Sequence, residues 1–245
     1  MKRAASRKNA SRAGALRRAA KERSTPDEAI YRRIYDSISA QELPPGTRLR
    51  EDHLRKLFGV SRARIRKVLS LLAYEGLVQI EPNRGASVAK PSADEARELF
   101  AARRAIEGAV VRDVVQRFGT AEKAILSKHI AKERAAEARR ERSEMIRLSG
   151  EFHLLLVQLS GNRVLQKFLR ELITRESLAI LAYETPGKPS CSNHEHQLIL
   201  DALVRKETDK AVALMIEHLE NVEDRLDLDR DARPVVDLAQ LFAAR

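Results

Sequence analysis

The stretch LPPGTRLREDHLRKLFGVSRARIRKVLSLLAYEGLVQIEPNRGASV, residues 43–88, determines how the first part of the chain folds. The Pro-Pro-Gly near its start ends any preceding helix. Residues 51–58 then place apolar side chains at helical spacing, namely Leu54, Leu57 and Phe58. Gly59 ends that segment, and Ser61 is a suitable N-cap for a second helix. The pattern predicts two helices joined by a tight turn.

The second helix is predicted to have an apolar face and a basic face. The apolar side chains are Ile65, Val68, Leu69 and Leu72, and the basic ones are Arg62, Arg64, Arg66 and Lys67. After Gly76, residues 77–80 and 86–88 resemble two short strands joined by the turn 82–85. Two helices followed by such a hairpin are typical of a winged helix-turn-helix domain.

An arginine-rich helix after a tight turn predicts DNA binding. A helix fits the major groove of DNA, and the arginine fork matches the O6 and N7 acceptors of guanine. The alternative is that these arginines form only a solvated face. The preceding turn, the N-cap and the hairpin favour the DNA-binding interpretation.

A further helix, residues 26–40, precedes this unit. Thr25 can cap it, and Pro26 occupies the first helical position. Its apolar side chains recur every four residues at Ile30, Ile34 and Ile38. We expect this helix to be a scaffold that packs on the back of the turn unit.

The positive charge is concentrated at the N-terminal end of the chain. The formal net charge over 245 residues is +11. Residues 1–25 hold nine basic residues and one Glu, which gives +8, whereas residues 26–90 contribute +4 and residues 91–245 contribute −1. We expect residues 1–25 to be a disordered basic arm that adds phosphate contacts; the alternative is an unused, solvated tail.

Cysteine content and hydropathy indicate the class of protein. Cys191 is the only cysteine, so an intramolecular disulfide and a thiolate-rich zinc site are excluded. No apolar run approaches the roughly 18 to 20 residues needed to cross a bilayer. We therefore expect a cytoplasmic protein without a membrane segment.

Residues 91–231 have a helical pattern almost throughout. The pattern is interrupted near Gly119, Gly161 and Gly187, and about six amphipathic segments can be distinguished in it. An antiparallel helical bundle is the expected result, so the fold class is mainly α. The tail, residues 232–245, contains a short amphipathic turn whose role the pattern does not decide.

Three histidines in apolar segments of this second domain are candidate metal ligands: His153, His196 and His218. Each alone is consistent with an ordinary core histidine. Together they form a chemically reasonable site for a divalent ion with open coordination positions. His194 is an alternative to His196, whereas His129 lies among charged residues and is predicted to be at the surface.

The first domain resembles the GntR family of bacterial transcription regulators. The segments that carry the resemblance are PPGTRLRE, FGVSRARIRKVL, EGLV and PNRGASV. The resemblance implies that Ser61, Arg62 and Arg66 contact bases or phosphates, and that Asn83, Arg84 and Gly85 form a wing tip in the minor groove. Arg50 and Arg64 complete the candidate DNA-binding set. Arg64 stands where the family often has proline, which predicts a local change in operator preference.

The second domain resembles the FCD effector-binding domain of the FadR-type branch of that family. The landmarks are Arg103 to Glu107, Phe152-His153, Ser160-Gly161-Asn162, Glu195-His196 and Met215 with His218-Leu219. The resemblance implies that His153, His196 and His218 bind zinc or nickel, which helps to hold a small carboxylate effector. The candidate effector-binding residues are Arg103, Ser149 and Asn162. Ser149 stands where metal-binding members usually have Asp or Asn.

These features predict a metabolite-responsive transcription regulator. We expect a repressor that binds a palindromic double-stranded DNA operator as a homodimer, in the bacterial cytoplasm and associated with the nucleoid. A metal-dependent hydrolase is one alternative, but no Glu lies in an HExxH-like frame. A non-specific nucleoid-binding protein is another, and it would show no operator preference.

Overall fold

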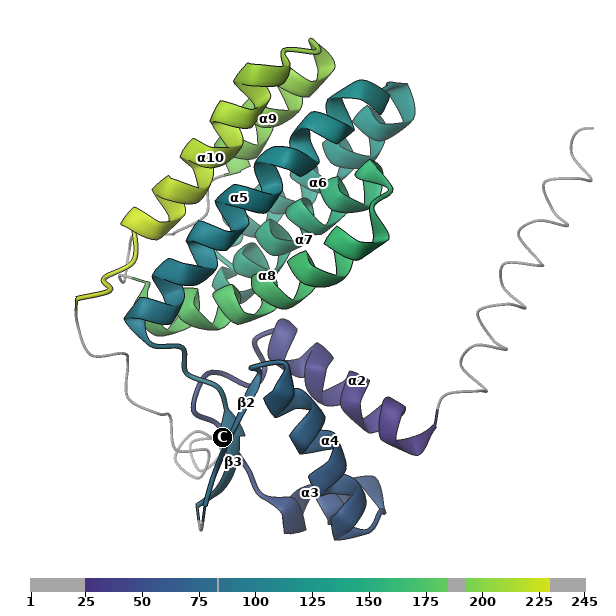
Figure 1. Ribbon diagram of the computed structural model, residues 1–245, viewed down its shortest axis with the longest axis vertical. Helices are drawn as coiled ribbons and strands as arrows, with labels where there is room; N and C mark the ends of the chain where they lie inside the picture. The colour runs from purple at the N-terminus through teal and green to yellow at the C-terminus, as the bar shows by residue number, and fades with distance from the viewer. Residues whose placement is uncertain (1–24, 83, 185–192, 230–245) are drawn as a thin grey trace, which may run out of the picture.

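The computed structural model describes residues 25–82, 84–184 and 193–229, which form a small head joined to a larger helical body (Figure 1). The basic arm up to residue 24, Asn83, Cys191 and the tail from residue 230 onward lie outside the described residues. The mainly α fold class is confirmed, with a winged helix-turn-helix head and an all-helical body. No helix in the described part of the chain is long and apolar enough to cross a membrane.

The head contains three helices and a small sheet. Its elements are α2 (Pro26–Ser39), β1 (Arg48–Leu49), α3 (Glu51–Phe58), α4 (Arg62–Tyr74), β2 (Val78–Glu81) and β3 (Gly85–Val88). The strands are antiparallel in the order β1-β3-β2, and Ser87 of β3 lies between Arg48 and Gln79. The sequence did not predict β1, because two residues are too few to show alternation and their pairing depends on the wing.

The turn between α3 and α4 has the predicted local structure. Gly59 ends α3 with a left-handed φ of 66°, and the Ser61 hydroxyl accepts a hydrogen bond from the Arg64 amide at 3.4 Å. One of the three apolar residues of α3 does not pack against the head core, because Leu57 is 66% exposed. Leu57 lies about 100° around the helix from Phe58, so only Phe58 and Leu54 pack against the head core.

The core of the head is apolar and includes one residue of the body. The three isoleucines of α2 and the four predicted apolar residues of α4 are all buried. Leu178 of the body is buried in the same cluster. The head and the body therefore share apolar packing as well as a chain connection.

Among residues 91–184 and 193–229, six helices form the body, which agrees with the about six predicted from the sequence. They are α5 (Ala93–Arg117), α6 (Thr120–Ala138), α7 (Arg142–Ser160), α8 (Arg163–Tyr183), α9 (Asn193–Val204) and α10 (Thr208–Asp224). Their long axes run side by side, and α8 lies along the side of the bundle that faces the head (Figure 1). A large apolar core joins α5, α7, α9 and α10 and surrounds the histidines described below.

Candidate metal centre and DNA-binding surface

The three predicted histidines meet inside the body. His153 is on α7, His196 on α9 and His218 on α10, and all three are buried. Nε2 of His218 lies 3.2 Å from Nε2 of His196 and 3.3 Å from Nε2 of His153. The three candidate ligand atoms lie within 4.8 Å of one another.

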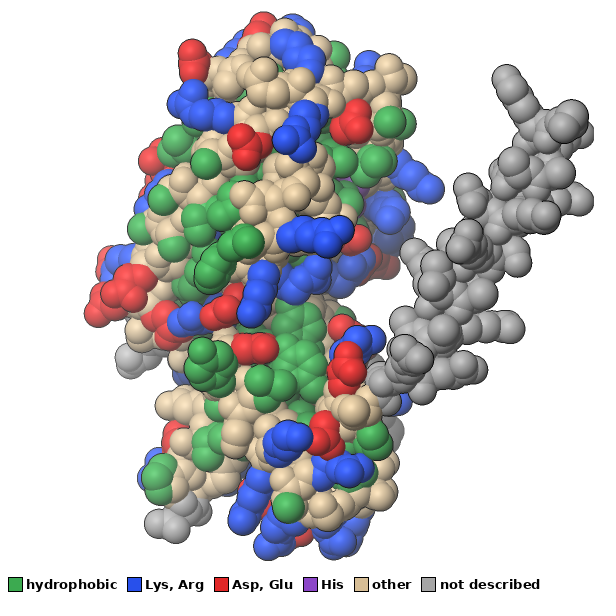
Figure 2. Space-filling view, turned by 45° about the vertical axis from the view of Figure 1, so that its right-hand side comes forward, with side chains coloured by type: hydrophobic (Ala, Val, Ile, Leu, Met, Phe, Trp, Pro, Cys, Tyr) green, Lys and Arg blue, Asp and Glu red, His purple; other side chains and the backbone are tan. Residues whose placement is uncertain are grey.

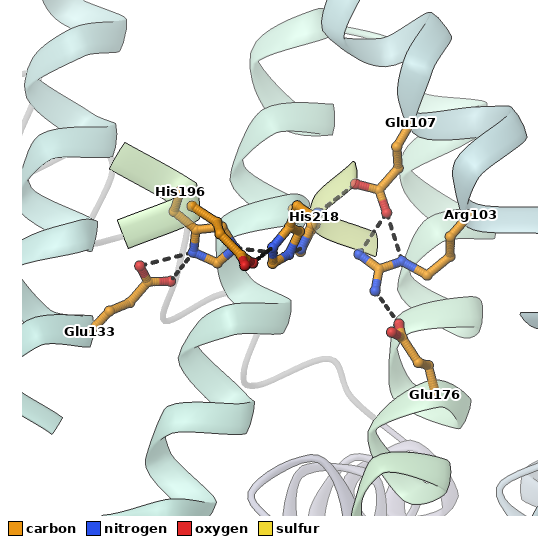
Figure 3. A network of polar contacts seen from close by, with 8 residues as sticks. Arg103, Glu107, Glu133, Glu176, His196 and His218 are labelled. Carbon is orange, nitrogen blue, oxygen red and sulfur yellow. Dashed lines mark hydrogen bonds and ion pairs between the residues drawn. The ribbon is translucent and has the colours of Figure 1, made fainter. Parts of the chain in front are cut away.

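A carboxylate contacts the other nitrogen of each ring. The pairs are His153 Nδ1 with Glu107 at 2.5 Å, His196 Nδ1 with Glu133 at 2.9 Å and His218 Nδ1 with Glu195 at 2.7 Å. A carboxylate accepts the Nδ1 proton, so each Nε2 of the neutral ring is left with a free lone pair. Three nitrogens with free lone pairs therefore lie close together, and Figure 3 shows two of these rings, His196 and His218, side by side. This donor set fits a divalent cation.

Burial keeps two of the three rings, His153 and His218, in the neutral form that binds metal. Burial lowers the pKa of His153 well below its usual value and lowers that of His218 to about 4. Burial alone would raise the pKa of Glu133, but His196 and His129 outweigh it and lower the pKa to about 2. The neutral His153 and His218 imidazoles are ready to bind a metal without first losing a proton.

Two other histidines do not belong to this cluster. The prediction that His129 lies at the surface was wrong, because only 3% of the residue is exposed. Its Nε2 lies 2.9 Å from the Leu148 carbonyl oxygen and 3.4 Å from Glu133. Lys128 and Lys132 of α6 are exposed, whereas His129 and Glu133 are buried. His194, the alternative ligand, is exposed and lies outside the cluster.

Arg103 of α5 connects the histidine cluster to a small cavity. Its Nε donates to Glu107 Oε1 at 2.6 Å, and its Nη1 donates to Glu176 Oε2 (Figure 3). The cavity measures about 10 Å³, which is room for about one water molecule. Its lining residues include Arg103, Ser149, His153, Glu176, Ser177 and His218.

The third candidate effector residue, Asn162, does not line this cavity. It is the N-cap of α8, and its side-chain oxygen accepts hydrogen bonds from the amides of Val164 and Leu165 at 3.1 and 3.0 Å. Sequence reasoning assigned no role to four acidic residues around the histidines: Glu107, Glu133, Glu176 and Glu195. The sequence pattern that could have revealed them is an acidic residue inside an otherwise apolar helical segment, such as Glu107 between Ile106 and Gly108.

The predicted DNA-binding arginines of α4 are exposed on the head. Lys and Arg side chains gather along its outer end (Figure 2). Each α4 arginine has an acidic partner: Arg62 with Asp52 at 2.6 Å, Arg64 with Asp27 at 2.8 Å and Arg66 with Glu51 at 2.9 Å. The hydrogen bond from Arg62 lowers the pKa of Asp52. These exposed pairs are weak, so DNA phosphates and bases can replace the acids.

The remaining candidates frame the same surface. Arg50 is exposed at the N-cap position of α3, and Ser61 is exposed at the N-cap of α4. Arg84 is exposed in the wing, 3.5 Å from Glu81. Gly85 has a left-handed φ of 83°, which its lack of a Cβ permits where the wing begins β3. The structure thus places the basic helix α4 on the same head as the wing hairpin that carries Arg84.

Comparison with known proteins assigns the chain to a family. Residues 26–88 match the family model described as bacterial regulatory proteins, gntR family, and residues 98–221 match the FCD domain. The chain belongs to the GntR family. It is a DNA-binding transcription regulator and not an enzyme, which removes support for the hydrolase alternative. GntR regulators bind small effectors through FCD domains, which also commonly bind metal.

Relatives of this GntR-family regulator match most of its length. It is 28% identical over 199 residues to the HTH-type transcriptional repressor RspR of Escherichia coli, covering 81% of this chain and 87% of that protein. It is 30% identical over 191 residues to the regulator YdhC of Bacillus subtilis, covering 77% and 85%. A GntR crystal structure from Rhodococcus sp. RHA1 has the same fold, with a TM-score of 0.73 at 23% identity and coverage of 82% and 97%.

Proposed function

We propose that this GntR-family protein is a metabolite-responsive repressor that binds a palindromic operator as a homodimer. The observation that carries the proposal is the cavity lined by Arg103, His153 and His218 beside the histidine cluster, in a body that shares its packing with a basic winged helix. Two relatives support repression rather than activation. RspR and the NanR protein of Salmonella newport, at 28% and 27% identity, are both named transcriptional repressors.

His153, His196 and His218 would hold a divalent ion, zinc or nickel. Such an ion supplies a positive charge and open coordination positions for an anionic ligand. Glu107, Glu133 and Glu195 orient the three rings. Ser149 lines the adjacent cavity, where its hydroxyl can contact the ligand directly or through water.

Arg103 would bind the effector carboxylate. Its Nη2 lies 2.6 Å from Glu107 Oε1 but makes no hydrogen bond within the described residues. An arginine with a spare N–H beside a metal site is a suitable partner for a carboxylate. The cavity itself holds about one water molecule, so an effector must displace side chains as it enters. This displacement is what makes the ligand able to change the structure.

Helix α8 would carry that change to the head. Ile173, Glu176 and Ser177 line the cavity, while Leu178 is buried in the head core. On the same helix, the Thr174 hydroxyl lies 2.8 Å from the hydroxyl of Tyr35 on α2. For a ligand to act as a switch, it must bind one arrangement of the heads more tightly than the other.

Two heads on symmetric half-sites would give operator selectivity, because a single head makes few base contacts. The proposed DNA-contacting residues are Arg50, Ser61, Arg62, Arg64, Arg66, Arg84 and Gly85, with Asn83 at the wing tip.

The test is to incubate the full-length protein with fragmented genomic DNA at near-physiological salt and sequence the retained fragments. Enrichment of a short inverted repeat supports the proposal, and loss of that enrichment on adding a candidate acid identifies an effector that releases DNA. Uniform retention would favour the nucleoid-binding alternative instead. A monomer that still selects the repeat would contradict the homodimer.

A further inference from the structure

Glu176 is a buried carboxylate that is only half satisfied. Only 2% of the residue is exposed, and its Oε2 accepts a hydrogen bond from Arg103. Its Oε1 is buried and has no hydrogen-bond partner among the described residues. Leaving a buried acceptor without a donor destabilises a fold, and the penalty is larger for a charged group. Because Glu176 lines the cavity, a bound molecule can supply the missing donor.

The charges around the cavity point to the type of donor. Among the described lining residues, Arg103 is the basic side chain that accompanies Glu176, and it is shared with Glu107. One guanidinium thus faces two buried carboxylates. A neutral donor would complete the hydrogen bonding of Glu176, but a cationic donor also balances its charge.

We propose that the effector is a small amino acid, whose ammonium group donates to Glu176 while its carboxylate faces Arg103 and the histidine cluster. This inference rests on the proposed function, because it adds a second recognition group to the same effector site. Glu176 is then the residue that selects amino-substituted acids from other carboxylates. Burial raises the pKa of Glu176 to about 7, and an adjacent ammonium group favours its ionised form.

The rest of the cavity limits the size of the ligand. Its apolar lining residues are Ile146, Ile173, Ile180 and Val222. Gly150 leaves no spare room on one side, since a Cβ added there would lie 2.8 Å from Ile173 Cγ2. These side chains fit a short aliphatic skeleton rather than a sugar ring or a long acyl chain.

The experiment measures binding of matched acids to the full-length protein by isothermal titration calorimetry. Each series keeps one carbon skeleton: propionate, lactate and alanine; succinate, malate and aspartate; glutarate, 2-hydroxyglutarate and glutamate. In at least one series we expect the amino acid to bind about tenfold or more tightly than the unsubstituted acid. Glu176→Gln should remove most of this preference and leave the unsubstituted acid within about threefold.

A matched control distinguishes the effect of a carboxylate in the cavity from the effect of removing a negative charge from α8. Glu171→Gln removes the same charge from the same helix, but Glu171 lies outside the cavity lining and its side chain is 40% exposed. This variant should keep the preference for the amino acid. Arg103→Gln should weaken binding of all members of the series that binds, because each carries the carboxylate.

Several outcomes would overturn the inference. Equal binding of the amino and unsubstituted acids would contradict it while leaving a carboxylate effector in place. If the hydroxy acid of a series bound most tightly, the group that donates to Glu176 would be a neutral hydroxyl and not an ammonium, and the inference would be wrong. If no acid of any series bound, both this inference and the carboxylate effector would fail for short skeletons. The order of affinities among the matched acids is measured on the unaltered protein. It therefore tests whether the effector is an amino acid even if Glu176→Gln does not fold.

Discussion

Nε2 of His196 lies 3.2 Å from Nε2 of His218, and the Nδ1 atom of each ring contacts a carboxylate. With both Nδ1 protons donated to carboxylates, the two facing nitrogens are both acceptors. Two acceptors at this distance gain no hydrogen bond from each other, so a cation that both nitrogens bind would stabilise the arrangement.

Metal should therefore stabilise the folded protein. Zinc or nickel at about 100 times its dissociation constant should raise the free energy of unfolding by about 2.7 kcal/mol. For a chain of this size that corresponds to an increase in melting temperature of ~5–10 °C. Thermal unfolding with and without metal, together with metal analysis of the purified protein, measures both the gain and the stoichiometry.

His218→Ala should abolish this metal-dependent gain, whereas His194→Ala should retain it. His194 is exposed and lies outside the cluster, so it controls for non-specific binding to imidazole. An equal gain in both variants would show that the metal binds somewhere else.

Glu176 should make stability depend on pH between 4.5 and 7. Burial raises its pKa in the folded protein from 4.5 to about 7. The folded state therefore holds the proton more tightly than the unfolded state, so this contribution is complete below pH 4.5 and is lost as the pH rises through 7. Relative to Glu176→Gln, the wild type should lose up to about 3 kcal/mol across this range. Urea unfolding at a series of pH values tests this, and a constant difference between the two proteins would refute it.

Arg66 and Lys67 should contribute differently to DNA binding. Arg66→Ala should cost about 1 to 3 kcal/mol of discrimination between the operator and random DNA if Arg66 contacts a base. Lys67→Ala removes the same charge from the next residue and should weaken both DNAs alike. Titrations of each variant with both duplexes at one salt concentration give the comparison. Equal losses on the two DNAs with Arg66→Ala would assign Arg66 to the phosphates.

Tyr35 should transmit the effector signal to the head. The Thr174 hydroxyl donates to the Arg170 carbonyl, so the Tyr35 hydroxyl is the donor in the 2.8 Å bond between α2 and α8. Tyr35→Phe should cost about 0.5 to 1.5 kcal/mol of stability. It should also move the ratio of DNA affinities with and without effector towards one.

The control for this coupling is Tyr31→Phe. Tyr31 stacks on Tyr35 but donates to Glu75, inside the head. Tyr31→Phe should leave the ratio of DNA affinities with and without effector unchanged. The same reduction in both variants would mean that the phenol groups stabilise the head rather than transmit a signal.

Local sequence signals predicted the head and the helices of the body. Ser61 as an N-cap and Gly59 as a helix end act over three or four residues, so the printed sequence contains the information they need. The same reasoning missed β1, whose two residues pair with β3, about 38 positions further along the chain. It also misplaced His129, because Lys128 and Lys132 near it in the sequence are exposed, whereas His129 is buried against Glu133.

The sequence by itself determined the helical body, the basic turn unit and the identity of three candidate ligands. Only the tertiary structure decided that these histidines meet and which groups orient them. His153 and Glu107 are 46 positions apart, and His196 and Glu133 are 63 apart. Such pairs form when helices pack, and periodicity along one helix carries no information about the rotation of its neighbours. The unsatisfied oxygen of Glu176 likewise exists only because packing removes water from around it.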